Sequence, residues 1–477
     1  MNYCDLEPKK VFEYFLEMSG IPRGSGNMKG IADYIEAFAK GRGLRCYRDA
    51  ANNVVIYKGA SAGYEASCPI ILQGHLDIVC QKDADREIDF TAEGLDVYVD
   101  GEFVRARGTT LGADNGIAAA MILAILDDDK LAHPAIEAVF TTDEEIGMLG
   151  AMALDMSVLT AKKLINLDSE EEDVLTVSCA GGSDFCVTLP TDRKCVQGTK
   201  LTVCLSGLQG GHSGIEIDKG RVNADVLAGR ILSGIKTDFE IISVDGGNMD
   251  NAIPKENTTA LCTTDPASLK AELEDMLEKI QAEISDRESG FVFELTTGES
   301  GEYSVLSDRC KKDIIYTLLL VPNGVIDMSV GIAGLVETSL NLGVLVTEDD
   351  KIKLSFALRS NKGSALSFLE KRLSYFFSKI ECEIETGGHY PPWEFKENSA
   401  LQALYRECYV AQRGCEPKVE AIHAGLECGT FASKIEGIDC IAIGPTMFDV
   451  HTTGEKLLIA SVGRTYELLL DILKKSK

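Results

Sequence analysis

A histidine and an aspartate stand two positions apart at the end of an apolar run that is typical of a buried strand. The run Ile70-Ile71-Leu72-Gln73-Gly74 leads into His75 and Asp77. Because side chains alternate between the two faces of an extended chain, we expect these two on the same face. An imidazole that binds a metal ion usually has a supporting carboxylate. The pair indicates a candidate metal site, although by itself it also fits an ordinary buried histidine.

Four further places carry carboxylates or a histidine after strand-like runs or in turns. They are Asp114 before a helix, Asp143-Glu144-Glu145 after an apolar run, Asp168 after a strand, and His451 beyond Ile443-Gly444-Pro445. The ordinary alternatives are a helix N-cap for Asp114, a solvated loop or surface run for the other acids, and a loop histidine for His451. Five such places on one predicted sheet favour a single site. Histidine and carboxylate ligands without cysteine suit zinc, manganese or cobalt in a catalytic role.

Size and composition restrict the class of protein. At 477 residues, with 45% hydrophobic and 26% charged, the chain is expected to form two or three ordinary domains. The formal charge of −28 argues against nucleic acid and against an anionic membrane surface as partners. The segment Met1–Phe15 has no signal-peptide pattern, and no apolar run is long enough to span a bilayer. The 15 cysteines, scattered without paired spacing, fit a reducing compartment, so we predict a cytoplasmic protein.

Two patterns of predicted secondary structure alternate along the chain. Up to Gly181-Gly182, helices alternate with strand-like runs, which indicates a largely parallel sheet covered on both faces. An α+β pattern follows to about Tyr390, and the alternation of helices and strands returns after Pro391-Pro392. We therefore predict an α/β fold with a discontinuous domain at residues 1–183 and 395–477 and an inserted α+β domain at residues 184–394. In the inserted domain we expect strands at Lys200–Leu205, Phe239–Val244, Thr258–Thr263, Phe291–Thr296 and Lys351–Arg359, and helices at Arg221–Gly234, Ser268–Ser285 and Ser364–Ser378.

The chain resembles the co-catalytic dizinc peptidases, a family that includes carnosinases, aminoacylases and glutamate carboxypeptidases. The resemblance rests on Gly74-His75-Leu76-Asp77, Gly112-Ala113-Asp114-Asn115-Gly116, Thr142-Asp143-Glu144-Glu145-Ile146-Gly147, Asn166-Leu167-Asp168 and Gly210-Gly211-His212-Ser213-Gly214. Within the family it is most similar to the bacterial aminoacyl-histidine dipeptidases, which cleave Xaa-His dipeptides of the beta-alanyl-histidine type. That narrower similarity rests on Leu6-Glu7-Pro8, Ile21-Pro22-Arg23-Gly24-Ser25-Gly26-Asn27 and Ile422-His423-Ala424-Gly425-Leu426-Glu427-Cys428-Gly429.

The resemblance implies a zinc-peptidase-like catalytic domain that holds two divalent ions, with zinc expected first and manganese or cobalt as alternatives. It assigns the metal ligands His75, Asp114, Glu145, Asp168 and His451, with Asp114 as the bridge. It further implies that Asp77 orients His75. The metal pair would lower the pKa of a bridging water. Glu144 would take the proton of that water as the hydroxide attacks, and then pass it to the leaving amine.

The resemblance also gives roles to residues of the inserted domain, which would act as a lid. His212 is implied as a donor to the tetrahedral oxyanion. Arg359 could hold the C-terminal carboxylate of a dipeptide by a two-point contact, or form a surface salt bridge. Asn251 could assist substrate binding, or be a turn asparagine. Outside the inserted domain, His423 and Glu427 could line the pocket that receives the amino end of the substrate.

The lid is larger than a dimerisation module needs, and two similar halves are an open alternative. Such halves could imitate a partner subunit, so that His212 serves its own active site rather than that of a neighbour. A homodimer is favoured, with the oligomeric state left open.

We therefore expect metal-dependent hydrolysis of short peptides, first of all carnosine-like Xaa-His dipeptides. One alternative is an N-acyl amino acid deacylase or a carboxypeptidase with the same dizinc core. Another is a non-catalytic binding protein that retains the fold. The complete set of His75, Asp114, Glu144, Glu145, Asp168 and His451 argues against the non-catalytic alternative.

Overall fold

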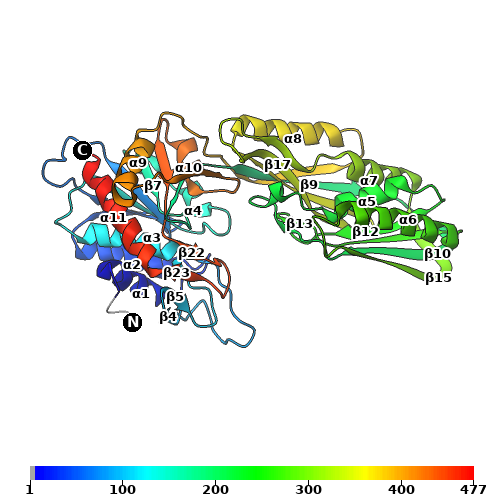
Figure 1. Cartoon of the computed structure of the whole chain (residues 1–477), viewed down its shortest axis with the longest axis horizontal. Coiled ribbons are helices and arrows are strands. Elements are labelled where there is room, and N and C mark those ends of the chain that lie inside the picture. The colour runs from blue at the N-terminus through cyan, green and yellow to red at the C-terminus, as the bar shows by residue number, and fades with distance from the viewer. Residues whose placement is uncertain (1–5) are drawn as a thin grey trace. The chain divides into compact units, whose positions relative to one another are not determined.

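A computed structural model describes residues 6–477, which divide into two compact units (Figure 1). The flanking unit comprises residues 6–179, 393–421 and 425–477, and the inserted unit comprises residues 180–392 and 422–424. Of the segment Met1–Phe15, in which we expected no signal peptide, the first five residues lie outside the described part. Among the described residues, none of the helices has the length and apolar character needed to cross a bilayer.

An eight-stranded sheet forms the centre of the flanking unit, in the order β1-β2-β6-β3-β7-β21-β8-β20. Strands β6, β3, β7 and β21 run parallel to one another, whereas β1 pairs antiparallel with β2, β2 with β6, and β8 with β21. The mixed α/β sheet that we predicted is confirmed, and β6, β3, β7 and β21 form a run of four parallel strands within it. The strands are β1 (Arg45–Arg48), β2 (Val54–Lys58), β3 (Ile70–His75), β6 (Ile136–Thr141), β7 (Lys163–Asn166), β8 (Val174–Cys179), β20 (Lys418–Ile422) and β21 (Asp439–Ala442).

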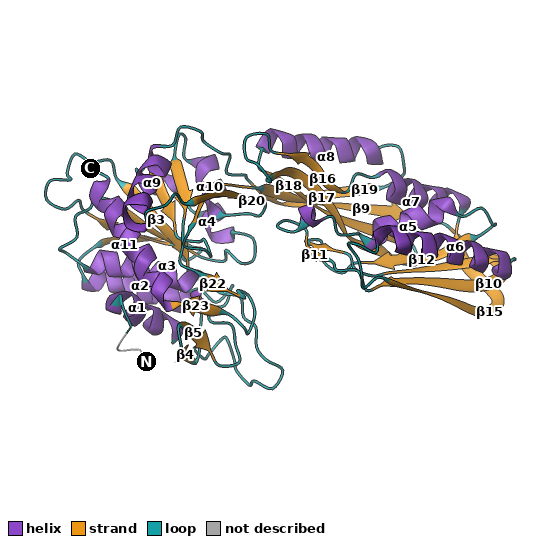
Figure 2. Ribbon diagram, viewed as in Figure 1, coloured by secondary structure: helices purple, strands orange, loops and turns teal. Residues whose placement is uncertain are grey.

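Helices surround this sheet (Figure 2). Every residue of β3 and β6 is buried, as expected for central strands of a parallel sheet with helices on its faces. A second sheet has the order β22-β23-β5-β4, with strands β4 (Val97–Asp100), β5 (Phe103–Ala106), β22 (Met447–Phe448) and β23 (Lys456–Leu458). The helices are α1 (Lys9–Ser19), α2 (Lys29–Gly41), α3 (Ala113–Asp127), α4 (Leu149–Ala153), α9 (Ala400–Arg413), α10 (Glu427–Lys434) and α11 (Ile459–Lys475).

Lys58 caps the C-terminal end of α3. Its Nζ donates to the carbonyl oxygens of Ile125, Leu126 and Asp128 at 3.2, 3.0 and 2.8 Å. The last carbonyls of a helix have no partner within the helix, and a cation there is favourable.

Replacing Lys58 with Met should therefore lower the free energy of unfolding by about 1–3 kcal/mol, because buried carbonyls lose their donor. Urea denaturation measures the change. Lys29→Met, at an exposed lysine, is the control and should change stability by less than about 0.5 kcal/mol. Equal unfolding midpoints for Lys58→Met and the wild type would contradict the cap.

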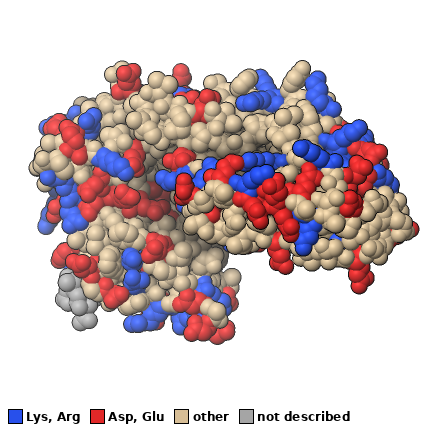
Figure 3. Space-filling model, turned by 45° about the vertical axis from the view of Figure 1, so that its right-hand side comes forward, with Lys and Arg blue, Asp and Glu red and all other residues tan. Residues whose placement is uncertain are grey.

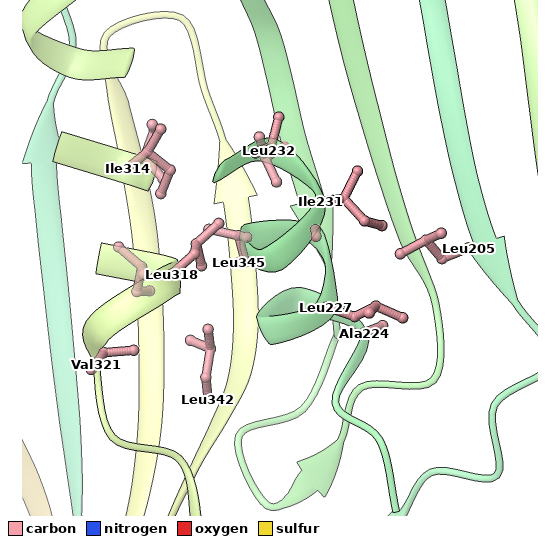
Figure 4. Close-up of a cluster of buried hydrophobic side chains, with 14 of the residues drawn as sticks. Leu205, Ala224, Leu227, Ile231, Leu232, Ile314, Leu318, Val321, Leu342 and Leu345 are labelled. Atoms are coloured by element: carbon pink, nitrogen blue, oxygen red, sulfur yellow. The ribbon is translucent and has the colours of Figure 1, made fainter. Parts of the chain in front are cut away.

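The inserted unit is built on an antiparallel sheet in the order β15-β10-β14-β12-β17-β18-β9-β19, with β16 paired to β17. Its helices pack on the sheet through one apolar core, into which Leu227 and Ile231 of α5 and Ile314 and Leu318 of α7 project (Figure 4). The elements are β9 (Gly181–Pro190), β10 (Arg193–Ser206), β11 (Gly211–His212), α5 (Ala224–Gly234), β12 (Glu240–Gly246), β13 (Ala252–Ile253), β14 (Asn257–Thr263), α6 (Pro266–Ile284), β15 (Val292–Leu306), α7 (Asp308–Leu320), β16 (Gly324–Met328), β17 (Val336–Thr347), β18 (Lys351–Ser360), α8 (Gly363–Phe377) and β19 (Glu383–Tyr390).

Two halves of the inserted unit share one topology. The segments β10-α5-β12-β14-α6-β15 and β9-α7-β17-β18-α8-β19 each follow a β-α-β-β-α-β order. In both halves, the strands lie in the sheet in the order fourth, first, third, second. The halves join where β12 pairs with β17 at Gly246 and Leu345. That such halves replace a partner subunit remains a prediction.

Acidic side chains are spread over the visible surface of both units, with Lys and Arg among them (Figure 3). A large part of the formal charge of −28 is therefore solvated. The acids that bear on the site are the buried ones described next.

Candidate metal centre

The predicted metal ligands of the flanking unit lie together. His75 ends β3, Glu145 and Asp168 follow β6 and β7, and these three strands are parallel neighbours in the sheet. The carboxyl ends of parallel strands meet at one edge, where open α/β sheets bind their ligands. Asp114 in the first turn of α3 and His451 in the loop after β22 complete the cluster.

Asp114 stands between two sets of ligand atoms. Its Oδ1 lies 3.1 Å from His75 Nε2, and its Oδ2 lies 3.1 Å from His451 Nε2. Asp168 Oδ1 lies 3.5 Å from His75 Nε2, and Glu145 Oε1 lies 3.1 Å from His451 Nε2. Each set thus offers one imidazole and two carboxylate oxygens, and within each the ligand atoms lie within 4.8 Å of one another. This donor set fits two divalent ions with Asp114 shared between them.

The charges of the cluster favour cations. Burial raises the pKa of Glu145 and that of Asp168, and nearby carboxylates raise both further. Burial alone would lower the pKa of His75, but Asp168 and Asp114 raise it well above its ordinary value. Hydrogen bonds to Asp114 and Glu145 raise the pKa of His451 to about 11. The buried carboxylates place an excess of negative charge in the cluster, which the imidazoles compensate by holding protons and which bound divalent cations would neutralise in place of those protons.

Asp77 holds the Glu144-Glu145 loop and the loop of Ser25 in place by hydrogen bonds. It is fully buried, and its Oδ1 lies 3.5 Å from His75 Nδ1. Its oxygens accept hydrogen bonds from the backbone N–H of Glu144 and Glu145 at 3.0 and 3.1 Å, and from the Ser25 hydroxyl at 2.8 Å. Burial would raise its pKa, but His75 and these donors lower it on balance, so Asp77 stays ionised.

Glu144 also lies in the cluster, in a group with His75 and Glu145. Its carboxylate accepts no hydrogen bond from the described residues. Burial raises its pKa well above the ordinary value, and Asp168 and Glu427 add to the effect. A raised pKa helps a carboxylate to keep a proton that it has taken from water, as a general base must.

Glu427, which we predicted to bind substrate, lies fully buried in the flanking unit. Its Oε2 accepts hydrogen bonds from Gln73 Nε2 at 2.5 Å and from the Thr141 hydroxyl at 2.7 Å, whereas its Oε1 has no partner. Burial raises its pKa to about 8. Glu427 therefore joins β3 to β6 directly below the ends of these strands.

The remaining predicted residues belong to the inserted unit. His212 pairs with Ala252, and the N–H of Ser213 donates to the carbonyl of Asn251 at 2.8 Å, so the His212 and Asn251 loops are joined. The Nδ1 of His212 accepts from the N–H groups of Gly214 and Ile215 at 3.1 and 3.2 Å. The imidazole proton must then reside on Nε2, which is available as a donor.

His423 and Arg359 lie near His212, close enough for the charge of Arg359 to lower the pKa of both histidines. Burial, together with the charges of Arg359 and His212, lowers the pKa of His423 to about 3, so the ring is neutral. Its Nε2 and Nδ1 contact the Ser339 hydroxyl at 2.7 Å and Asn361 Oδ1 at 3.2 Å.

Arg359 is 9% exposed, and its Nη1 donates to the Tyr390 hydroxyl at 2.8 Å, while its Nε has no partner. No ion pair joins it to a carboxylate within the described part of the chain. A buried guanidinium that forms no close ion pair with a described carboxylate is suited to bind a ligand carboxylate.

Glu455 and Arg23 are functional candidates that the sequence patterns did not reveal. Both side chains are buried, and both contact the segment that carries Asp114. Arg23 is part of a motif that supported the family resemblance, and Glu455 follows His451 by four positions. The motif that contains Arg23 and the short distance of Glu455 from His451 in the sequence are the only hints of a role. Neither indicates a contact with residues 111–113.

The sequence and the fold are similar to those of known peptidases. Residues 71–475 match the model of peptidase family M20/M25/M40. The chain is 38% identical over 478 residues to the cytosol non-specific dipeptidase of Escherichia coli (strain K12), across 98% of each protein. The crystal structure of aminoacylhistidine dipeptidase from Vibrio alginolyticus is similar, with a TM-score of 0.90, 34% identity and coverage of 99% of this chain and 98% of that one. Aminopeptidase PepT from Bacillus cereus ATCC 10987, at 15% identity, a TM-score of 0.60 and 99% coverage of both chains, shares the fold.

Proposed function

We propose that this chain, a peptidase that belongs to peptidase family M20/M25/M40, hydrolyses dipeptides with the help of two divalent ions. The observation that carries the proposal is the position of Asp114, which offers one oxygen to the set of His75 and Asp168 and the other to the set of His451 and Glu145. Zinc is the first candidate for both ions, with manganese or cobalt as alternatives.

Ions held by these five ligands would supply Lewis acidity toward the scissile carbonyl and the attacking water. The residues of the chain handle the protons. We assign to Glu144 the removal of a proton from the attacking water and its delivery to the nitrogen of the leaving amine. Asp77 holds the backbone of Glu144 and Glu145, so that Glu145 would be placed to hold a metal while the Glu144 carboxylate stays free.

We assign to His212 the stabilisation of the oxyanion that develops on the scissile carbonyl. Its Nδ1 is occupied by two backbone donors, so its Nε2–H is available, and burial and Arg359 lower its pKa so that the ring is neutral. A fixed neutral donor of this kind lowers the barrier of acyl transfer. Whether it serves its own active site or that of a partner is part of the oligomer proposal, in which a homodimer is the first candidate.

We assign to Arg359 the C-terminal carboxylate of the substrate, with Asn251 and His423 nearby in the inserted unit. Arg359→Met should raise KM for a dipeptide about 10- to 100-fold, because a charge-assisted hydrogen bond of about 1.5–3 kcal/mol is lost. The turnover number should change much less. Steady-state kinetics measure both.

Two controls belong to this measurement. Dipeptide amides lack the carboxylate, so the wild type and Arg359→Met should bind them equally well. Arg193→Met removes another guanidinium of the inserted unit, one that donates to backbone carbonyls, and should leave KM unchanged. An Arg359→Met enzyme with wild-type KM for dipeptides would refute the assignment.

The substrate class is proposed from the names of the relatives. One is called a non-specific dipeptidase and the other an aminoacylhistidine dipeptidase, so Xaa-His dipeptides such as carnosine are the first candidates within a broader set. The name of the Escherichia coli relative also supports the cytoplasm as location.

A panel of Xaa-His dipeptides, other dipeptides, tripeptides and N-acetyl amino acids, assayed with zinc-loaded protein, tests the substrate class. Turnover of dipeptides is the expected result. Exclusive turnover of N-acetyl amino acids would refute the dipeptidase assignment in favour of a deacylase. Exclusive release of C-terminal residues from longer peptides would favour a carboxypeptidase instead. The absence of all turnover would favour the non-catalytic alternative.

A further inference from the structure

We propose that Glu455 and Arg23 form a buried clamp that fixes Asp114 between the two proposed metal positions, so that metal affinity depends on both residues. The proposal rests on the proposed role of Asp114 as the shared ligand. Neither Glu455 nor Arg23 belongs to the groups that could hold a metal. Both are therefore positioning residues.

Asp114 needs external support because its own backbone is irregular. Although it lies in the first turn of α3, Asp114 and Asn115 have non-helical backbone angles, and Gly112 before them has φ of 66°. The usual hydrogen bonds of a helix therefore do not fix the position of Asp114.

Glu455 supplies this support from one side. Its Oε2 accepts hydrogen bonds from the N–H groups of Leu111 and Gly112 at 2.7 and 3.0 Å, and its Oε1 accepts from Ala113 N–H at 2.8 Å. The side chain is 2% exposed. Glu455 also lies four positions after His451. The clamp thus joins the segments of two ligands that belong to the same proposed metal.

Arg23 holds the same segment from the other side. Its Nη2 donates to the carbonyl of Gly112 at 2.7 Å, and its Nη1 donates to the carbonyl of Leu76 at 2.9 Å. Leu76 lies between His75 and Asp77, so Arg23 joins the β3 loop to the Asp114 segment. A Cβ atom at Gly112 would lie 3.0 Å from Arg23 Nη2, and one at Gly116 would overlap the same nitrogen. Glycine at both positions leaves the space that the guanidinium fills.

The clamp connects segments with one ligand from each set. His75 and His451 would bind different ions, and both of their loops are attached through Arg23 or Glu455 to the segment of the shared Asp114. Residues that orient metal ligands typically change metal affinity about 10- to 100-fold when they are replaced. An unsupported Asp114 would have to be ordered by the ions themselves, which reduces the affinity.

The variant Glu455→Gln tests the clamp. It replaces one carboxylate oxygen by an NH2 group, which cannot accept a hydrogen bond from the backbone N–H groups that face it. The full chain is stripped with a chelator, and its Kd for zinc is measured by competition with a chromogenic chelator. We expect the Kd to rise about 10- to 100-fold.

Glu137→Gln is the matched control. Glu137 is also buried in the flanking unit, at 5% exposed, and accepts hydrogen bonds from the N–H groups of Thr160 and Ala161 at 3.0 and 3.1 Å. Its turn carries no proposed metal ligand. Like Glu455→Gln, Glu137→Gln should lower the thermal stability of the metal-free protein. Unlike Glu455→Gln, it should keep the zinc Kd of the wild type.

Asp114→Asn separates the clamp from the function on which it rests. Weak zinc binding by Asp114→Asn together with wild-type binding by Glu455→Gln would overturn the clamp and leave the metal site standing. Wild-type zinc binding by Asp114→Asn would overturn both. If Glu455→Gln does not fold, Arg23→Lys decides, since one ammonium cannot reach the Leu76 and Gly112 carbonyls as the guanidinium does. A wild-type Kd in Arg23→Lys would then overturn the clamp.

Discussion

Replacing Glu144 with Gln should lower the turnover number about 10²- to 10⁴-fold, which is the usual contribution of a general base. The amide has nearly the shape of the carboxylate, but it cannot take a proton from water. The carboxylate of Glu144 accepts no hydrogen bond from the described residues, so replacing it by an amide should disturb little else. Steady-state kinetics on a dipeptide, with metal analysis of the same sample, measure the effect.

The metal content of Glu144→Gln should remain that of the wild type, because the two proposed sets of ligands are complete without it. Asp129→Asn, at a carboxylate whose side chain is 97% exposed, is the control and should keep full turnover. A Glu144→Gln enzyme with undiminished turnover would exclude Glu144 as the base.

Replacing Asp114 with Asn should lower activity about 10³-fold or more, because Lewis-acid assistance of several kcal/mol is lost and each 1.36 kcal/mol corresponds to a factor of ten. The amide offers one neutral oxygen in place of two charged ones, so one set loses a ligand and the other keeps only a weaker one. Metal analysis after gel filtration should give fewer than two zinc ions per chain.

His451→Gln is the companion to Asp114→Asn, because it removes a ligand from one set only. It should retain one zinc ion, bound by the set that contains His75 and Asp168. Removal of metal from the wild type by a chelator should abolish activity, and added zinc should restore it. Two tightly bound ions in Asp114→Asn would contradict the shared ligand.

The metal cluster could be predicted from the sequence because its signals are local. The run Ile70–Gly74 ends in His75, and the structure continues β3 to that residue. The acids after β6 and β7 follow apolar runs in the same way. Parallel neighbours then bring the ends of these strands together, which a single rule about parallel sheets anticipates.

Much of the inserted unit could not be predicted in this way. The sequence patterns did not indicate β9, α7 and β17, nor the four-stranded sheet of the flanking unit. β9 alternates buried and half-buried residues, and its partners β18 and β19 lie more than 150 positions further along the chain. Pairing over such distances leaves no local pattern. The contacts of Glu455 with residues 111–113 were missed for the same reason, since 342 to 344 positions separate them.

Anomalous diffraction from crystals grown with zinc tests the central claim most directly. We predict two peaks about 3.5–4 Å apart, with one Asp114 oxygen directed to each. His75 and Asp168 should bind one ion, and His451 and Glu145 the other. A single peak, or an Asp114 side chain directed away from both peaks, would contradict the account.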